Sequence, residues 1–123
     1  MPVYFVGCGG DLNGAPSGIL SSPGYPNPLP VNRFCVWSIT VPKGRRIRIE
    51  FIDLDLGWSR THCNQRLSFH NGRSMSFPLK NFCGQDPPEV VESSFNKMLI
   101  YYMVRFPTNN RGFKASYTSD LPD

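Results

Sequence analysis

The sequence predicts an all-β fold of the antiparallel sandwich class, and three observations carry this prediction. Twelve prolines and eleven glycines break the 123-residue chain into short segments. Between them, β-branched and aromatic residues alternate with polar ones at the period of two that strands show, and helical signals are nearly absent. Four cysteines, an even number, are typical of a chain stapled by two disulfides in an oxidising compartment. Many short strands with disulfides indicate a sandwich.

Five segments carry the strand pattern most clearly: residues 35–41, 46–56, 66–72, 97–106 and 112–119. In the second of these, the apolar residues keep one parity as far as Phe51 and take the other parity from Ile52, which continues in Leu54 and Leu56. That flip predicts a β-bulge or a strand that passes between sheets.

Three aromatic residues have structural interpretations. Trp37 stands beside a cysteine on a predicted strand, and we expect it in the core. Phe113 is expected to face inward at the start of the last strand. Tyr25 is expected to pack its proline-rich loop onto the sheet.

Length and composition are those of a single globular domain. Hydrophobic residues make up 40% of the chain and charged residues 18%, which argues against disorder. No stretch approaches the roughly 20 apolar residues of a membrane-spanning helix, and the first ten residues lack the pattern of a secretory signal. The natural chain is therefore expected to continue on both sides of this segment.

The net charge of +4 suggests a weak preference for acidic partners. The basic residues are scattered, and the densest group is Arg45, Arg46 and Arg48. No nucleic-acid-binding motif accompanies them, so we expect a solvated surface there and no nucleic-acid partner.

The four cysteines, Cys8, Cys35, Cys63 and Cys83, are widely spaced and include no CxxC pair of the kind that structural zinc sites use. Two disulfides are therefore favoured over a zinc site or four reduced, buried thiols. The sequence allows three pairings. Pairing neighbours along the chain would close two moderate loops, each worth about 3 kcal/mol by loop-closure entropy.

The residue types that commonly carry catalysis form no recognisable motif. His62 and His70 have no serine or cysteine partner in a nucleophile motif such as GxSxG. His70 stands where a strand runs into a hairpin turn, and an outward polar residue there needs no special role. We therefore expect a non-catalytic domain without a cofactor.

Two acidic residues raise the question of a calcium site. Asp53 and Asp55 alternate along one strand segment, so both side chains are expected on one face, about 7 Å apart. Calcium needs several oxygen ligands, usually including two or more carboxylates from neighbouring loops. Without a third acid from elsewhere, the pair is interpreted as solvent-facing surface.

The order of landmarks resembles the CUB domain, a module of secreted and cell-surface proteins. The matching runs lie within residues 8–117 and read CGGDL, GILSSPGYPNPLP, CVWSITVPKGRRIRIEF, FCG, SSFNKMLIYY and RGFKASY. The resemblance implies a jelly-roll-like sandwich of two five-stranded sheets. It also implies that Cys8 pairs with Cys35 and Cys63 with Cys83. The domain is expected to span residues 8–118, with residues 1–7 as an N-terminal linker or strand and residues 119–123 as a C-terminal linker.

Many CUB domains hold a calcium ion at one end, where an acidic cluster captures a lysine of the partner. The resemblance assigns the three acidic ligands to positions that hold Gly57, Gln65 and Arg105 in this chain. None of these is a carboxylate, and the fixed charge of Arg105 repels a cation. We therefore expect no metal site.

The ligand-binding candidates that remain at that end are Trp58, Arg60, Gln65 and Arg105. Exposed tryptophan and arginine are typical of interaction hot spots, although Trp58 has an equally good interpretation as a residue folded back onto the sandwich. If this end binds, an aromatic–arginine surface would face an acidic protein, with acidic glycans as a second ligand class.

The expected function is protein recognition by an extracellular domain, secreted or part of a cell-surface ectodomain. The sequences of these motifs are similar to those in the CUB arrays of an endocytic receptor. In such an array the domain would bind a ligand or act as a spacer between its neighbours. One alternative is a substrate-targeting module of a secreted serine protease or metalloprotease. Another is a stand-alone, secreted, glycan-binding protein similar to the spermadhesins.

Overall fold

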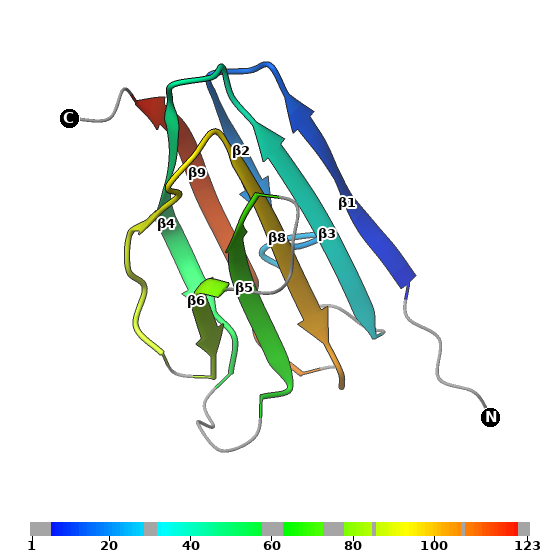
Figure 1. Ribbon diagram of the computed structural model, residues 1–123. Helices are drawn as coiled ribbons and strands as arrows, with labels where there is room; N and C mark the ends of the chain where they lie inside the picture. Colours follow the sequence, from blue (N-terminus) through cyan, green and yellow to red (C-terminus); the bar gives the residue numbers. More distant parts are fainter. Residues whose placement is uncertain are drawn as a thin grey trace.

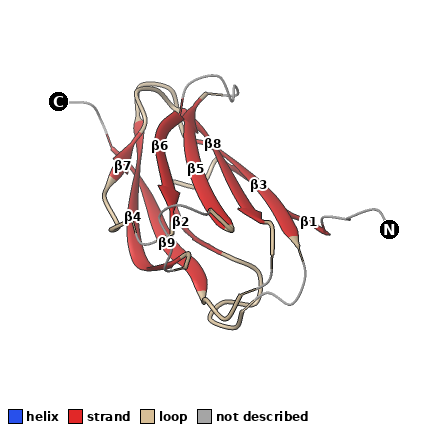
Figure 2. Ribbon diagram, turned by 90° about the horizontal axis from the view of Figure 1, so that it is seen from below, coloured by secondary structure: helices blue, strands red, loops and turns tan. Residues whose placement is uncertain are grey.

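A computed structural model describes residues 6–28, 32–57, 63–72, 78–84, 86–106 and 108–120. These residues form nine strands and contain no helix (Figure 2). In chain order the strands are β1 (Val6–Asn13), β2 (Ser17–Ser21), β3 (Arg33–Thr40), β4 (Arg46–Asp55), β5 (Gln65–Asn71), β6 (Pro78–Cys83), β7 (Val91–Glu92), β8 (Lys97–Val104) and β9 (Gly112–Asp120).

The strands form two sheets that pack face to face (Figure 1). One sheet has the order β1-β3-β8-β5-β6 and the other the order β2-β9-β4-β7. All described pairs are antiparallel except β1 and β3, which run parallel. The predicted all-β sandwich is confirmed, with five strands in one sheet and four in the other among the described residues, where five in each were expected.

The five predicted strand segments correspond to β3, β4, β5, β8 and β9. The sequence analysis did not predict β1, β2, β6 and β7, and β1 is rich in glycine. Gly9 has a φ of +110°, and a Cβ built on it would lie 1.9 Å from the carbonyl oxygen of Val36. Only glycine lets β1 approach β3 so closely. A residue type typical of turns is therefore required here inside a strand.

The core lies between the sheets and is built from the alternate, inward residues of the long strands. β8, and β3 from Phe34 onwards, alternate half-buried and buried positions, as the period-two pattern predicts. Trp37 and Phe113 are both buried, as expected, and their rings meet edge to face with centroids 5.5 Å apart. Phe51, Phe69 and Phe82 form a second aromatic cluster, with centroids 5.1–6.0 Å apart. Each fully buried side chain of this size stabilises the fold by roughly 1.5–3 kcal/mol.

The predicted β-bulge in β4 is confirmed. Phe51 pairs with Ala115 and Asp53 with Lys114, so Ile52 is the extra residue of the bulged strand. Ile52 is 58% exposed. The expectation that it shares an apolar face with Leu54 and Leu56 is therefore wrong, because the bulge turns its side chain out of the alternation.

The two disulfides are Cys8–Cys35 and Cys63–Cys83. The first joins directly opposed residues of β1 and β3, with Cα atoms 4.4 Å apart. The second joins the residue two positions before β5 to the last residue of β6, with Cα atoms 5.4 Å apart. Each bond therefore holds an edge strand to the sheet.

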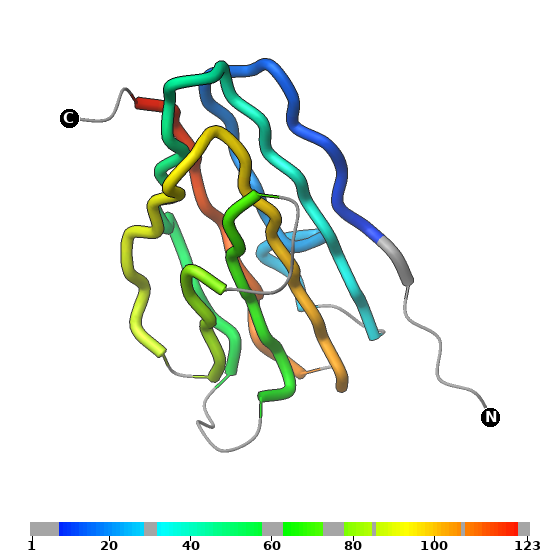
Figure 3. Tube along the Cα trace, viewed as in Figure 1, coloured from blue at the N-terminus to red at the C-terminus, as the bar shows by residue number. Residues whose placement is uncertain are grey.

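The sandwich has two ends with different sets of loops (Figure 3). The Arg111 end comprises residues 22–28, 56–57, 63–65, 105–106 and 108–111, and the Phe95 end comprises residues 14–16, 41–45, 72 and 93–96. β9 continues to Asp120 and finishes beside Arg46 at the Phe95 end. Across the described part of the chain, no helix has the length and apolar character needed to cross a membrane.

Candidate functional site

The Arg111 end brings together charged residues that are far apart in the sequence. Arg111 lies in the loop before β9, and Asp53 and Asp55 are among the last three residues of β4. The guanidinium of Arg111 binds Asp53 through two parallel contacts, Nε to Oδ2 at 2.7 Å and Nη2 to Oδ1 at 2.9 Å. Its Nη1 also lies 3.4 Å from Oδ2 of Asp55. This bidentate geometry is the strongest form of an arginine–carboxylate pair.

Both carboxylates also bind neighbouring loops. The hydroxyl of Tyr25 donates to Oδ2 of Asp53 at 2.6 Å, which ties the β2–β3 loop to β4. The backbone N–H of Arg111 and the side-chain amide of Asn110 donate to Asp55, each at 2.9 Å. The interpretation of these acids as plain solvent-facing surface is therefore wrong: each side chain is 22% exposed and connects two elements.

The electrostatics follow from these contacts. The hydrogen bond from Arg111 holds the pKa of Asp53 well below its ordinary value, at about 2, and the hydrogen bond from Tyr25 acts in the same direction. The same bond to Asp53 raises the pKa of Tyr25, and the pair raises the pKa of Arg111. Asp53 is therefore ionised at every physiological pH, and its charge is neutralised by Arg111.

Gln65 lies beside this cluster and is 3% exposed. Its Oε1 accepts a hydrogen bond from the hydroxyl of Tyr102 at 2.7 Å, and its Nε2 donates to Oγ1 of Thr108 at 2.9 Å. Burial raises the pKa of Tyr102, so its hydroxyl stays protonated and remains a donor. The Gln65 amide therefore joins β5, β8 and the β8–β9 loop through neutral hydrogen bonds.

The other predicted site residues are placed differently. The side chain of Arg105 is exposed, and its backbone N–H donates to the carbonyl of Asn64 at 2.7 Å. Gly57 has a φ of +120°, a conformation that side-chain-bearing residues rarely adopt. Trp58 and Arg60 lie outside the described residues. The structure thus places Gln65 and Arg105 at one end, but Gln65 is an internal brace and Arg105 faces solvent.

Neither histidine marks a catalytic site. His62 lies outside the described residues. His70 is 5% exposed, although the sequence predicted an outward polar residue, and its ring packs edge to face on Tyr101 with centroids 5.4 Å apart. Its Nε2 lies 3.2 Å from Oγ of Ser68, and burial lowers its pKa, so the ring is neutral at physiological pH. Within the described ranges, no three histidine, cysteine or acidic side chains are grouped as a metal site would need.

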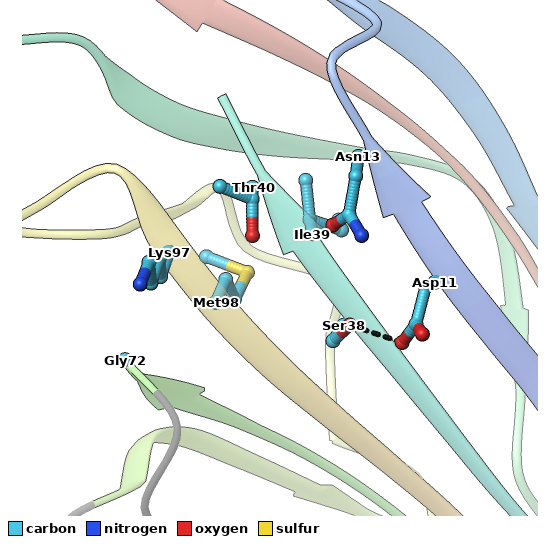
Figure 4. A pocket seen from close by; sticks show the side chains of 8 residues that line it. All are labelled: Asp11, Asn13, Ser38, Ile39, Thr40, Gly72, Lys97 and Met98. Carbon is cyan, nitrogen blue, oxygen red and sulfur yellow. Dashed lines mark hydrogen bonds between the residues drawn. The ribbon is translucent and has the colours of Figure 1, made fainter. Parts of the chain in front are cut away.

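A shallow hollow opens on the five-stranded sheet near the ends of β1 and β3 (Figure 4). Its volume is about 270 Å³, below the roughly 300–1,000 Å³ of small-molecule sites. The hydroxyl of Ser38 donates to Asp11 at 2.5 Å, so the one carboxylate in its lining already has a protein partner. We assign it no function.

Comparisons with known proteins agree with this architecture. The family model of the CUB domain matches residues 8–117. Human cubilin is 40% identical over 114 residues, which are 91% of this chain and 3% of cubilin. Mouse procollagen C-endopeptidase enhancer 2 is 34% identical over 116 residues, which are 94% of this chain and 28% of that protein. The chain therefore spans only a small part of the curated relatives that it matches.

A solved structure gives the same result for the fold. The crystal structure of the MASP-1 CUB2 domain bound to Ca²⁺ superposes with a TM-score of 0.76 at 25% identity, and the match covers 88% of this chain and 96% of that domain. The sandwich, the two disulfides and the match over residues 8–117 lead to one conclusion: this chain belongs to the CUB domain family, whose members are non-catalytic modules for protein interaction.

Proposed function

We propose that this chain is a calcium-independent recognition domain of a longer extracellular protein, and that it binds an acidic protein partner through the Arg111 end. Membership of the CUB family supports protein recognition in general. The small share of cubilin that the chain spans is consistent with one domain of an array, as in an endocytic receptor.

The neutral hydrogen bonds of Gln65 are the observation that carries the calcium-independent part of this proposal. The solved MASP-1 domain is bound to Ca²⁺, whereas the positions assigned to the acidic ligands hold Gly57, Gln65 and Arg105 in this chain. Gln65 uses both ends of its amide on protein partners. Protein hydrogen bonds therefore connect β5, β8 and the β8–β9 loop at this position, and Gln65 offers no carboxylate to a cation.

The nearby acids do not replace the missing ligands. Asp53 and Asp55 are bound by Arg111, and a cation would have to displace that guanidinium from a bidentate pair. At Gly57, the φ of +120° supports the same proposal, because a glutamate at this position would need a different backbone.

An acidic partner is favoured by the groups that face solvent at this end. Arg105 is exposed, and the adjacent Phe106 is 61% exposed, a residue that the sequence analysis did not single out. A large apolar side chain next to an arginine is typical of interaction hot spots. Trp58 and Arg60, the other candidates for this surface, lie outside the described residues.

Other parent proteins remain consistent with these features. The 34% identity to procollagen C-endopeptidase enhancer 2 supports, as a second candidate, a module that directs a secreted protease to its substrate. Glycan binding of the spermadhesin kind rests on the net charge of +4.

The calcium part is tested by thermal unfolding of the 123-residue chain in 1 mM calcium and in excess chelator, with the MASP-1 CUB2 domain as the positive control. The two curves of this chain should superimpose while those of the control separate. A ligand at about 100 times its Kd stabilises a fold by roughly 2.7 kcal/mol, which is easily detected. A calcium-dependent rise in the melting temperature of this chain would refute the proposal.

The binding part is tested by NMR titration of the ¹⁵N-labelled domain with a capped decapeptide of alternating glutamate and tyrosine. Amide shifts are expected at Arg105 and Phe106, and both Arg105→Glu and Phe106→Ala should weaken the affinity. The affinity is read from the shifts of Arg105 and Phe106, and Lys97→Glu, on the far end of β8, is the charge-matched control. If Arg105→Glu and Lys97→Glu have the same effect, the Arg111 end is not the binding surface.

A further inference from the structure

The Phe95 end carries an exposed aromatic side chain. Phe95 lies between β7 and β8 and is 68% exposed, more than any other large apolar side chain in the described ranges. Single exposed apolar residues are common and need no explanation. Three features of its surroundings distinguish Phe95. Hydrogen bonds fix the backbone of its loop, a hollow lies beside its ring, and basic residues lie nearby.

The backbone that presents Phe95 is fixed by hydrogen bonds on both sides. Oγ of Ser93 accepts from the N–H of Ile47 at 2.8 Å and donates to the carbonyl of Phe95 at 2.6 Å. On the other side, Asn96 and Val41 exchange two hydrogen bonds, from the Val41 N–H to the Asn96 carbonyl at 2.9 Å and from the Asn96 side-chain amide to the Val41 carbonyl at 3.0 Å.

A third attachment joins the same loop to β5. Asn71 accepts from the N–H of Ser94 at 2.9 Å and donates to its Oγ at 3.1 Å. The loop is thus tied to β4, β5 and the β3–β4 loop, which lie together at this end (Figure 1). Because the backbone of this loop is already ordered, binding through Phe95 costs little additional backbone entropy.

A hollow of about 250 Å³ opens beside the Phe95 ring, lined by Gly44, Arg45, Arg46, Ser94, Phe95 and Asn96. Small-molecule sites occupy roughly 300–1,000 Å³, so this hollow suits a single side chain of a partner. The lining combines an aromatic ring and a glycine with two arginines.

The charge around the hollow is predominantly positive. Lys43, Arg45 and Arg46 take part in no ion pair with any described residue, although Asp120 lies opposite Arg46 in the strand register. Arg48, the next cation along β4, is in contrast neutralised by Glu50 and Glu92 at 2.8 and 2.5 Å. Lys43, Arg45 and Arg46 are therefore available to an anionic ligand at the Phe95 end, with Asp120 as a nearby acid.

We propose that the hollow bounded by Phe95, Arg45 and Arg46 is a second protein-binding surface, and that it takes an acidic peptide segment with a large apolar side chain between its carboxylates. The apolar side chain fills the hollow against Phe95, and the flanking carboxylates pair with the arginines. An acidic glycan would satisfy the charges but leave the Phe95 ring without an apolar partner. The surface lies at the opposite end from the proposed Arg111-end site, so one domain can bridge two partners.

The test is an NMR titration of the ¹⁵N-labelled 123-residue chain with three capped decapeptides, alternating glutamate–leucine, glutamate–serine and lysine–leucine, and with a heparin-derived oligosaccharide. The glutamate–leucine peptide should shift the amides of residues 44–46 and 94–96. The glutamate–serine and lysine–leucine peptides should bind at least about tenfold more weakly, because each lacks one half of the recognition.

The variants locate the effect. Phe95→Ala and Arg45→Glu should each weaken binding of the glutamate–leucine peptide about tenfold or more, and the affinity should fall with rising salt. Ile19→Ala and Arg66→Glu, which change an exposed apolar residue and an exposed cation elsewhere, are the matched controls and should have no effect. Equal loss in the control variants, equal binding of the serine peptide, or binding of the oligosaccharide alone would each overturn the proposal. Because shifts at Arg105 and Phe106 are read separately, the two proposed sites fail or succeed independently.

Discussion

Replacing Asp53 by asparagine tests the central electrostatic feature of the Arg111 end. The substitution keeps the size of the side chain but removes the charge that binds Arg111 and accepts from Tyr25. The pKa of Asp53 falls from 3.8 to about 2 in the folded protein. Because the folded state holds the carboxylate more strongly than the unfolded state does, ionisation of Asp53 stabilises the fold.

The magnitude follows from the lowered pKa. Each pKa unit corresponds to about 1.4 kcal/mol, so the ionised form contributes at most roughly 2.5 kcal/mol. Arg111 is 52% exposed, and solvent screening of its charge reduces the expected value to about 1–2 kcal/mol. The contribution is complete above pH 4, declines as the pH falls from about 4, and is mostly lost by pH 2.

Urea unfolding at a series of pH values between 2 and 7, followed by tryptophan fluorescence with the disulfides intact, measures this contribution. Asp53→Asn should lower the free energy of unfolding by about 1–2 kcal/mol at pH 7, and the difference from the parent chain should shrink towards pH 2. Glu50→Gln is the matched control, because Glu50 pairs with Arg48 but is 58% exposed and should change the free energy by less than about 1 kcal/mol. A loss of equal size at pH 2 and pH 7 would show that packing, and not the charge, accounts for the effect.

Three further changes have expected outcomes that follow from geometry. Gly112→Ala should destabilise the fold by about 2 kcal/mol or more in urea unfolding, because φ is +93° and the new Cβ would lie 2.1 Å from Oγ of Ser22; unchanged stability would mean that β9 shifts freely. Replacing Cys63 and Cys83 by alanine should remove about 3 kcal/mol, since the bond closes a loop between residues 20 apart; a melting temperature that stays the same would contradict this. Phe69→Ala should cost about 3–5 kcal/mol, because Phe69 is fully buried within an aromatic cluster; a cost near zero would show that the cluster refills the cavity.

Much of the fold could be predicted because its information is local. The period-two pattern placed the five clearest strands, and the change of parity between Phe51 and Ile52 predicted the bulge that the strand register shows. β1 was harder, since Gly9 is typical of a turn when its neighbours in space are unknown. Its place in the sheet depends on the backbone of Val36, which is distant in the sequence and directly adjacent in the fold.

The candidate site was only partly predictable. The residue types at Gly57, Gln65 and Arg105 can be read from the sequence, but the hydrogen-bond partners of Gln65 cannot. The error at Asp53 has the same origin: an alternating acid on a strand looks solvent-facing until the loop that carries Arg111, 58 residues further along the chain, is folded against it. His70 was misjudged because burial on the outer side of a sheet has no signature in strand alternation.

The sequence by itself determined the all-β class, the four cysteines that form two cystines, and membership of the CUB family. These features depend on residue identity and on spacing along the chain. Only the tertiary structure decided that Asp53 binds Arg111, that the buried Gln65 amide hydrogen-bonds Tyr102 and Thr108, and that Phe95 stands exposed beside Arg45 and Arg46. Exposure and charge pairing are properties of neighbours in space, and in a sandwich of antiparallel strands most such neighbours come from distant parts of the chain.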